Sequence, residues 1–451
     1  MKSSRRFSLA LLIGDLAGVF LAFNAVAVLR GILDPSEPLL WPLLVPAAFV
    51  IIAIALIDGY SSRSDFLSLD YSSQHLLAVF SATLATLLVT HVVLSGDFSL
   101  QQSRLVTILS FLLIAPVGLG IRRAFALRRA ATRGNRSVVF VGDLESARAF
   151  AEECDRADFH RPVLYAAPTP EDASPDRPAL GELLDQIERN ELQVEAVVLR
   201  EYTRELPPGI PQRLVQLHFS GVPTYTLELF HELVWRKIPL YRINQTWLFQ
   251  EGFSLARDPV FERLKRVSDI ALALVVLLLS APVLALAALA VWLDDRGPVF
   301  FRQTRVGRDR RPFPLYKLRT MRAATGGARY TAKGDKRITR VGSFLRASRL
   351  DELPQLWNVL KGDMSMIGPR AEWDVLVADY EKQIPCYHFR HLVRPGITGW
   401  AQVNYPYGAN LDDTLRKLEY DLYYIRNYSF RLDAAIVLKT VHVMLFAKGG
   451  R

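Results

Sequence analysis

The stretch from Arg349 to Arg370 reads RLDELPQLWNVLKGDMSMIGPR and contains the most informative residues of the chain. The adjacent carboxylates Asp351 and Glu352 are followed by Pro354, a residue typical of the first turn of a helix. This order predicts that both carboxylates lie at the positive end of a helix dipole, where an anion can bind. Such a pair is often only a solvated helix end, so the pattern alone leaves an active site and a surface position both open.

The residues around this pair are strongly basic. Residues 296–370 contain 18 Lys or Arg and 5 Asp or Glu, while the whole chain has a net charge of +10. Nearby cations keep carboxylates ionised, and an ionised carboxylate can act as a nucleophile or bind Mg²⁺ together with phosphate oxygens. A basic segment of this density suits anionic lipid, nucleic acid or a phosphate-rich substrate.

An uncharged apolar run, Ile270–Leu293, precedes the basic segment. As a helix it would be roughly 36 Å long, enough to cross a membrane. Pro282, with Ser280 two residues before it, would break that helix near its middle. Basic clusters flank the run on both sides, and a true span would place one of them outside, against the positive-inside rule. We therefore predict a re-entrant helix over about residues 265–294, broken at Ser280 and Pro282, that enters and leaves the membrane on the cytoplasmic face.

Four long apolar runs within the first 121 residues predict a four-helix transmembrane domain, which we place at residues 1–130. Single polar residues such as Asp15 and His91 are expected to face the interior of this bundle. Cations before the first run and after the fourth place both ends, and all that follows, in the cytoplasm. The four apolar runs, each near the length of a span, are Ser8–Leu29, Leu39–Ile57, His75–Leu94 and Leu105–Ile121.

Residues 137–251 predict a Rossmann-like α/β module, because short apolar strands such as Val138–Val141 and Ala196–Leu199 alternate with helical patterns. Gly142 and Asp143 follow the first strand, so the glycine-rich fingerprint of dinucleotide-binding loops is missing. A regulatory or scaffolding role is favoured over nucleotide binding. The fold class is therefore membrane α plus α/β, with a third domain over residues 260–451.

Further motifs surround the carboxylate pair, and with it they resemble a known family. They are FFRQTRVG (Phe300–Gly307), PLYKLRTM (Pro314–Met321) and RPGITGWAQVNYPYG (Arg394–Gly408). The last domain resembles the bacterial sugar transferase family, whose members are monotopic phosphoglycosyl transferases. The full layout resembles the large polyprenyl-phosphate hexose-1-phosphate transferases, which initiate exopolysaccharide or O-antigen synthesis. The resemblance implies a monotopic, mainly α catalytic domain that contains the re-entrant helix.

The resemblance also implies a mechanism. Asp351 would attack the β-phosphate of a UDP-sugar, release UMP and pass the sugar phosphate to undecaprenyl phosphate. Glu352, with Asp351, would hold Mg²⁺. Ser280 and Pro282 match the family's membrane break, although an alanine separates them here. The cations at the family's phosphate-handling positions are Lys317, Arg319, Arg370 and Arg394.

The implied location is the bacterial inner membrane, with the catalytic domain on the cytoplasmic face. Implied partners are membrane lipids, downstream glycosyltransferases and, as one option, a second copy of the chain. An inactive membrane scaffold or regulator is the main alternative, but intact Asp351, Glu352 and Arg370 argue against it. Nucleic-acid binding is disfavoured because no helix-turn-helix, RRM or zinc pattern occurs. A transporter of lipid-linked sugars would need more membrane spans than the four predicted here and one re-entrant segment. The sugar stays open.

Overall fold

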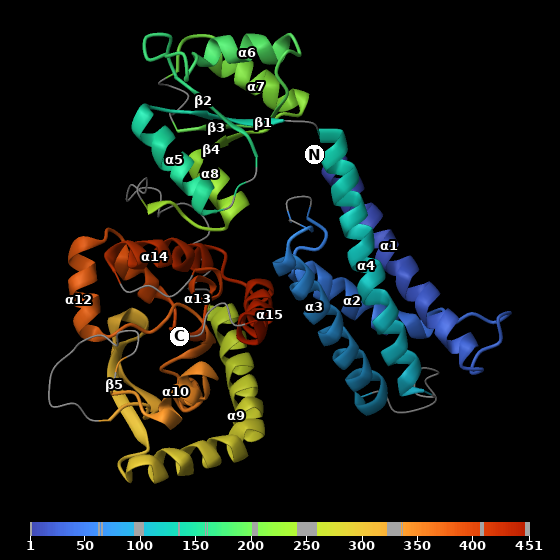
Figure 1. Ribbon diagram of the computed structural model, residues 1–451, viewed down its shortest axis with the longest axis vertical. Helices are drawn as coiled ribbons and strands as arrows, with labels where there is room; N and C mark the ends of the chain where they lie inside the picture. Colours follow the sequence, from blue (N-terminus) through green and yellow to red (C-terminus); the bar gives the residue numbers. More distant parts are fainter. Residues whose placement is uncertain are drawn as a thin grey trace. The chain divides into compact units, whose positions relative to one another are not determined.

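Helices dominate both units of the chain, Met1–Arg236 and Lys237–Arg451, in the computed structural model (Figure 1). The first unit contains the N-terminal helices and a parallel sheet, so the predicted division into three domains stays a prediction. The predicted boundary at residue 251, the end of the third apolar run at Leu94 and Pro406–Gly408 lie outside the described residues. The structure describes residues 2–61, 64, 66–93, 103–133, 136–157, 159, 161–200, 206–240, 259–322, 335, 337–405 and 410–446.

Among the described residues of the first unit, three helices are long and apolar enough to cross a membrane. α1 (Lys2–Leu29) packs beside α4 (Arg104–Arg133), and α3 (Leu69–Leu88) packs beside both α2 (Leu44–Leu56) and α4 (Figure 1). A π-helical turn, η2 (Val89–Val93), continues α3. The apolar segments of sufficient length are Phe7–Leu29, Tyr71–Val93 and Arg104–Arg128, and Pro259–Asp294 of the second unit is the fourth.

The second predicted run, Leu39–Ile57, forms a shorter helix than expected. A 3-10 turn, η1 (Trp41–Leu43), precedes α2, and the helical segment Trp41–Leu56 would be roughly 24 Å long. The hydrocarbon core is roughly 30 Å thick, so length alone does not establish this segment as a span. Pro42 occupies the first turn of η1, where its missing N–H is tolerated, and the helix begins there.

A buried ion pair lies among these helices. Asp15 of α1 accepts hydrogen bonds from Arg122 of α4 at 2.6 and 2.9 Å and from the Tyr60 hydroxyl at 2.6 Å. Arg122 is fully buried, although the sequence suggested a flanking cation outside the fourth run. The prediction that Asp15 faces the interior between the helices is confirmed. His91 is only half-buried, and its ring lies 2.8 Å from the hydroxyl of Thr90.

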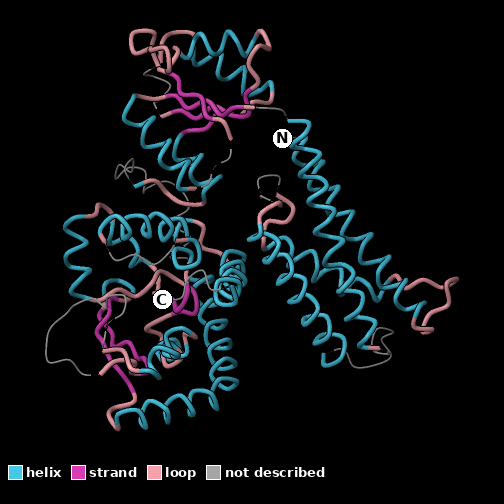
Figure 2. The backbone as a smooth tube through the Cα atoms, in the orientation of Figure 1, coloured by secondary structure: helices cyan, strands magenta, loops and turns pink. Residues whose placement is uncertain are grey.

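The middle of the chain forms a four-stranded parallel sheet in the order β2-β1-β3-β4, as the alternating pattern predicted. Its strands are β1 (Ser137–Val141), β2 (Val163–Ala166), β3 (Val194–Leu199) and β4 (Thr224–Thr226). Helices α5 (Leu144–Arg156) and α8 (Leu227–Phe230) cover one face, and α6 (Leu180–Glu188) and α7 (Ile210–Ser220) cover the other (Figures 1 and 2). Both faces are buried, which explains why the two central strands contain the apolar runs Val138–Val141 and Ala196–Leu199.

Asp143, in the loop after β1, is bound from within the loop region and from the end of β3. Asp143 accepts a hydrogen bond from the backbone N–H of Ser146 at 2.7 Å and pairs with Arg200. Asp143 therefore caps α5 at the position where a dinucleotide-binding loop would hold phosphate.

The second unit consists mainly of helices, which form its core, and its described residues contain two small two-stranded sheets. β5 and β6 form an antiparallel hairpin, and β7 pairs in parallel with β8. The core gathers around Trp400, Tyr424 and Ile436, all almost completely buried. In chain order the elements are α9 (Pro259–Asp295), β5 (Phe300–Val306), η9 (Arg308–Arg310), β6 (Pro312–Leu318), α10 (Arg340–Ala347), η10 (Leu350–Glu352), α11 (Gln355–Lys361), β7 (Ser365–Ile367), α12 (Asp374–Gln383), η11 (Tyr387–Leu392), β8 (Gly396–Thr398), α13 (Trp400–Asn404), α14 (Leu411–Arg426) and α15 (Phe430–Phe446).

Helix α9 contains the predicted break, but as a bend within one helix. Helix α9 is continuous from Pro259 to Asp295 and contains Pro282. Its axis changes direction sharply between its two ends (Figures 1 and 2). Proline removes one helical hydrogen bond and is the usual cause of a sharp kink. The hydroxyl of Ser280 donates to the carbonyl of Leu277 at 3.5 Å. The side chains along α9 are largely apolar and exposed, including Leu278 and Leu286.

Candidate active site

The carboxylate pair lies immediately before helix α11. Asp351 and Glu352 end the short 3-10 turn η10, and Pro354 is the residue that precedes the first helical residue, Gln355. Arg349, before the turn, has a φ of 60°, in the left-handed region that non-glycine residues seldom adopt. The expectation that the pair opens a helix is therefore met in outline, with a 3-10 turn in place of the first helical turn.

Glu352 is held by two cations from distant parts of the sequence. Its Oε1 accepts a hydrogen bond from Lys317 Nζ at 2.6 Å and lies 3.6 Å from Arg370 Nη2. The Glu352 side chain is only 12% exposed. Burial raises the pKa of Glu352, but Lys317 and Arg370 outweigh this and hold the pKa at about 2. Burial in turn lowers the pKa of the Lys317 ammonium.

Asp351 has a different environment from its neighbour. It is 8% exposed, and its carboxylate makes no hydrogen bond or ion pair with any residue that the structure describes. Burial raises the pKa of Asp351, and the more distant charges of Lys317 and Arg346 only partly oppose that shift. The two carboxylates are therefore shifted in opposite directions, an asymmetry that the sequence did not predict.

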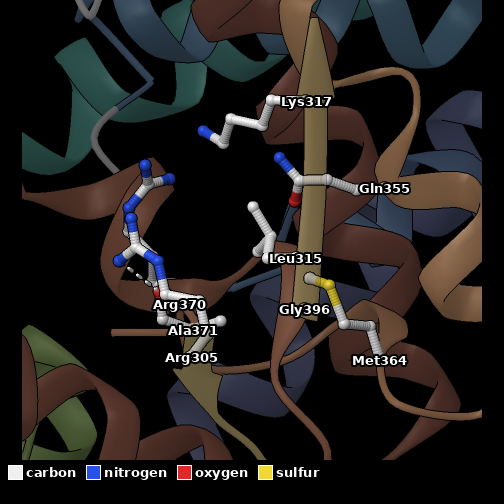
Figure 3. Close-up of a pocket in the computed structure, with 8 residues that line it drawn as sticks. All are labelled: Arg305, Leu315, Lys317, Gln355, Met364, Arg370, Ala371 and Gly396. Atoms are coloured by element: carbon white, nitrogen blue, oxygen red, sulfur yellow. Dashed lines mark hydrogen bonds between the residues drawn. The ribbon is translucent and has the colours of Figure 1, made fainter. Parts of the chain in front are cut away.

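A pocket opens beside these residues (Figure 3). The charged ends of Arg305, Lys317 and Arg370 extend into the same side of it. Several cations around one space neutralise phosphate groups well, and arginine can contact two phosphate oxygens at once. The lining residues are Arg305, Leu315, Lys317, Gln355, Met364, Arg370, Ala371 and Gly396.

Two of the four predicted phosphate-handling cations lie elsewhere in the second unit. Arg394 donates to Glu262 Oε2 at 3.0 Å and to the carbonyl of Gly362 at 3.2 Å. The guanidinium of Arg319 packs against Gly297 so closely that a Cβ at Gly297 would overlap it. Neither residue lines the pocket. Lys317 and Arg370 thus line the pocket and contact Glu352, the neighbour of Asp351. Asp351 and Glu352 themselves are not lining residues and lie beside the pocket through these cations.

Sequence reasoning missed Arg305 and Gln355 as pocket residues. Arg305 lies on β5, where its guanidinium donates to Gln303 Oε1 at 2.7 Å and to the Ala371 carbonyl at 3.1 Å. The antiparallel hairpin joins β5 to the strand that carries Lys317, so pairing the two motifs would have brought Arg305 to the site. Gln355 follows Asp351 by four residues, a spacing that often brings side chains together near a helix start.

The donor set fits a hard divalent cation. Among the residues that the structure describes, no three His, Cys, Asp or Glu side chains form a metal site by themselves. Both named contacts of Glu352 go to Oε1, so Oε2 and the Asp351 carboxylate remain as oxygen donors. Mg²⁺ is commonly bound by one or two carboxylates plus substrate phosphates and water, and this pair matches that pattern.

Comparison with known proteins points to one family. The model of the family described as bacterial sugar transferase matches residues 260–447. A UDP-N-acetylgalactosamine-undecaprenyl-phosphate N-acetylgalactosaminephosphotransferase of Aeromonas hydrophila is 39% identical over 271 residues, 60% of this chain and 63% of the relative. A UDP-glucose:undecaprenyl-phosphate glucose-1-phosphate transferase of Escherichia coli (strain K12) is 48% identical over 184 residues, 40% of this chain and 39% of the relative.

A shorter relative is matched over nearly its full length. The exopolysaccharide production protein PSS of Rhizobium leguminosarum bv. phaseoli is 43% identical over 187 residues, 40% of this chain and 93% of the relative. The chain thus spans 63% and 39% of the two longer relatives and almost all of this one. The family model falls on the unit that contains the carboxylate pair and its cations, and with the R. leguminosarum relative it shows that the chain belongs to the bacterial sugar transferase family.

Proposed function

We propose that the protein transfers a sugar 1-phosphate from a UDP-sugar to undecaprenyl phosphate, with release of UMP, as the first step of exopolysaccharide or O-antigen assembly. The observation that carries this proposal is the pairing of Asp351, buried and without a hydrogen-bonding partner among the described residues, with a cation-bound Glu352. The relatives from A. hydrophila and E. coli are both named for transfer to undecaprenyl phosphate, which supports it.

In the first half-reaction, an oxygen of the Asp351 carboxylate attacks the β-phosphorus of the UDP-sugar. The bond from that phosphorus to the bridging oxygen breaks, and UMP leaves with the oxygen. The sugar phosphate stays on Asp351 as an acyl phosphate. Since burial raises the pKa of Asp351, its carboxylate is more basic than a solvated one and a better nucleophile. Lys317, Arg370 and Arg305 neutralise the charge of the diphosphate.

In the second half-reaction, a phosphate oxygen of the lipid carrier attacks the same phosphorus. The bond to Asp351 breaks, the carboxylate is regenerated, and the product is a polyprenyl diphosphate sugar. One site can thus serve a soluble donor and a membrane-embedded acceptor in turn. Asp351 and Glu352 would hold Mg²⁺, which would supply further charge neutralisation at the diphosphate.

We also propose a location at the bacterial inner membrane, with the catalytic unit on the cytoplasmic face. In this arrangement the N-terminal helices anchor the chain, and α9 enters and leaves the membrane from one side. The bend in α9, its exposed apolar side chains and the exposed cations on both sides of its apolar segment, such as Arg263 and Arg302, support a re-entrant course. Downstream glycosyltransferases would then use the lipid-linked product.

The test is a direct assay of UMP. The full chain is purified in lipid discs and given Mg²⁺, undecaprenyl phosphate and either UDP-glucose or UDP-N-acetylgalactosamine, the donors in the relatives' names. UMP release that disappears with Asp351→Asn and with EDTA supports both the reaction and the nucleophile. Release at an undiminished rate from Asp351→Asn would remove Asp351 as nucleophile. No release with any UDP-sugar would favour the alternative of an inactive scaffold.

A further inference from the structure

Gln355 is a buried amide that faces the pocket without a protein partner. It is 4% exposed, and its side-chain amide makes no hydrogen bond to any residue that the structure describes. The other polar residues of the pocket differ in this respect. Lys317 and Arg370 both contact Glu352, and Arg305 is bonded to Gln303 and to the Ala371 carbonyl.

The position of Gln355 is fixed by the packing of α11 against β6. Three residues along the helix, Asn358 accepts a hydrogen bond from the backbone N–H of Tyr316 at 3.1 Å. Its amide nitrogen donates to the carbonyl of Pro314 at 2.7 Å. Since residues three apart share a helix face, Gln355 lies on the same face of α11, toward the strand that carries Lys317. At the other end of the helix, Arg266 donates to the carbonyl of Leu360 at 2.7 Å.

The Gln355 side chain is almost fully buried, but its amide atoms are not among the fully enclosed polar atoms without a partner, so the small exposure that remains includes the amide. Most polar side chains at this depth are hydrogen-bonded within the protein, and this amide has only the pocket to donate to. Figure 3 shows the Gln355 amide projecting into the space that also receives the amine of Lys317 and the guanidinium of Arg370. All three groups offer N–H donors to that space. A group that has only acceptor oxygens suits such a site, and a phosphoryl group is the clearest example.

We propose that Gln355 is a substrate-binding residue whose amide N–H donates to a phosphoryl oxygen, and this inference rests on the proposed function. A neutral amide has an advantage over a further cation at this position. Lys317 and Arg370 are drawn to Glu352, whereas an amide forms no ion pair with it and keeps its donor for the substrate. The phosphoryl oxygen can belong to the nucleotide sugar or to the lipid carrier, since both phosphates must reach Asp351.

The test uses the full chain in lipid discs with Gln355→Met, which keeps the length and removes the hydrogen bond, and Gln355→Glu, which adds a charge that repels phosphate. Gln383→Met is the matched control, because Gln383 is exposed on α12 and, among the described residues, its side chain bonds only to the Asp379 carbonyl. UMP release from UDP-glucose and from UDP-N-acetylgalactosamine is measured without carrier, and carrier dependence is then measured at saturating donor. Affinity for UDP and the melting temperature are measured for each variant.

We expect Gln355→Met to lower kcat/KM by about 10- to 100-fold, the usual effect of a lost hydrogen bond to a charged group, and Gln355→Glu to lower it further. The melting temperature should not fall, because no protein–protein hydrogen bond is lost. A defect in the carrier-free step assigns the donor diphosphate, and a defect confined to carrier dependence assigns the carrier phosphate.

Wild-type kinetics with both substrates in Gln355→Met would overturn the inference, as would an activity loss matched by a lower melting temperature. If the wild-type protein releases no UMP, the proposed function fails separately. Affinity for UDP then tests the phosphate-binding role of Gln355. Weaker UDP binding by Gln355→Met supports that role, and binding equal to that of the wild type contradicts it.

Discussion

Lys317 Nζ and Glu352 Oε1 lie 2.6 Å apart although 35 residues separate them in the chain. This contact joins the hairpin strand β6 to the turn that contains the proposed nucleophile. Asp351, the residue immediately before Glu352, has no cation within ion-pair distance among the described residues. The two neighbouring carboxylates therefore have different roles: Glu352 forms ion pairs with Lys317 and Arg370, and Asp351 has unshared oxygen lone pairs available for nucleophilic attack.

Asp351→Asn should abolish UMP release without loss of stability. An amide is not a nucleophile toward phosphorus, so kcat should fall by at least about 10³-fold. The carboxylate is buried and has no hydrogen-bonding partner among the described residues, so a neutral amide of the same shape should raise or maintain the melting temperature. UMP assay and thermal melting on the same preparations check this. A lower melting temperature would show that the Asp351 charge stabilises the fold.

Lys317→Met should destabilise the protein through Glu352. Removing one partner of a buried ion pair costs about 3–5 kcal/mol, and the effect should be somewhat smaller here because Arg370 remains near Glu352. The double variant Lys317→Met with Glu352→Gln should recover part of the loss, since no unpaired charge is left. Thermal or denaturant unfolding of the wild type, both single variants and the double variant gives the coupling directly. Additive losses would mean that the two side chains do not interact.

Acid should weaken the fold through Glu352. Its pKa is about 2 in the folded protein and 4.5 ordinarily, so its contribution is fully present above about pH 4.5 and is lost as the pH falls toward 2. The shift corresponds to about 3 kcal/mol as an order of magnitude. Glu352→Gln should therefore flatten the fall in stability over that range. Parallel pH profiles for the variant and the wild type would contradict this assignment.

Arg370→Gln and Arg394→Gln should separate a substrate contact from a structural one. Arg370 lines the pocket and lies 3.6 Å from Glu352, which Lys317 still binds, so its loss should lower kcat/KM for the UDP-sugar by about 100-fold with a smaller fall in melting temperature than Lys317→Met causes. Arg394 bonds to Glu262 and to the Gly362 carbonyl, so its loss should lower the melting temperature first. Donor kinetics and melting curves of the two variants check the contrast. A donor KM defect in Arg394→Gln at unchanged stability would place that residue at the substrate.

Local sequence patterns were sufficient for the sheet and for the bend in α9. Residues Val138–Val141 of β1 are all apolar because helices cover both faces of the sheet, and Pro282 acts within its own helix. The contacts of the site were not readable in this way. Asn358 bonds α11 to β6, the strand that carries Lys317 toward Glu352, and Arg394 contacts Glu262 at a separation of 132 residues. A motif indicates which residues matter, while their partners depend on tertiary packing.

The course of α9 can be tested by chemical labelling from the two sides of the membrane. The native Cys154 and Cys386 are first replaced by serine, and single cysteines are then placed at Arg263 and Arg302, one on each side of the apolar segment. A re-entrant helix places both positions in the cytoplasm, so a membrane-impermeant maleimide should label both only in inverted vesicles. A spanning helix would expose one position on each side.

Pro282→Ala makes the same experiment sensitive to the bend. Alanine restores the missing backbone N–H and removes the ring that distorts the preceding turn, so α9 should straighten. A straight apolar helix of this length favours crossing the membrane, and labelling at position 302 should then shift partly to the outer face. UMP release should fall in proportion, because crossing would carry the hairpin and its Lys317 away from the cytoplasmic donor. If labelling stays on one side while activity falls, Pro282 acts on the geometry of the site and not on the course of the helix.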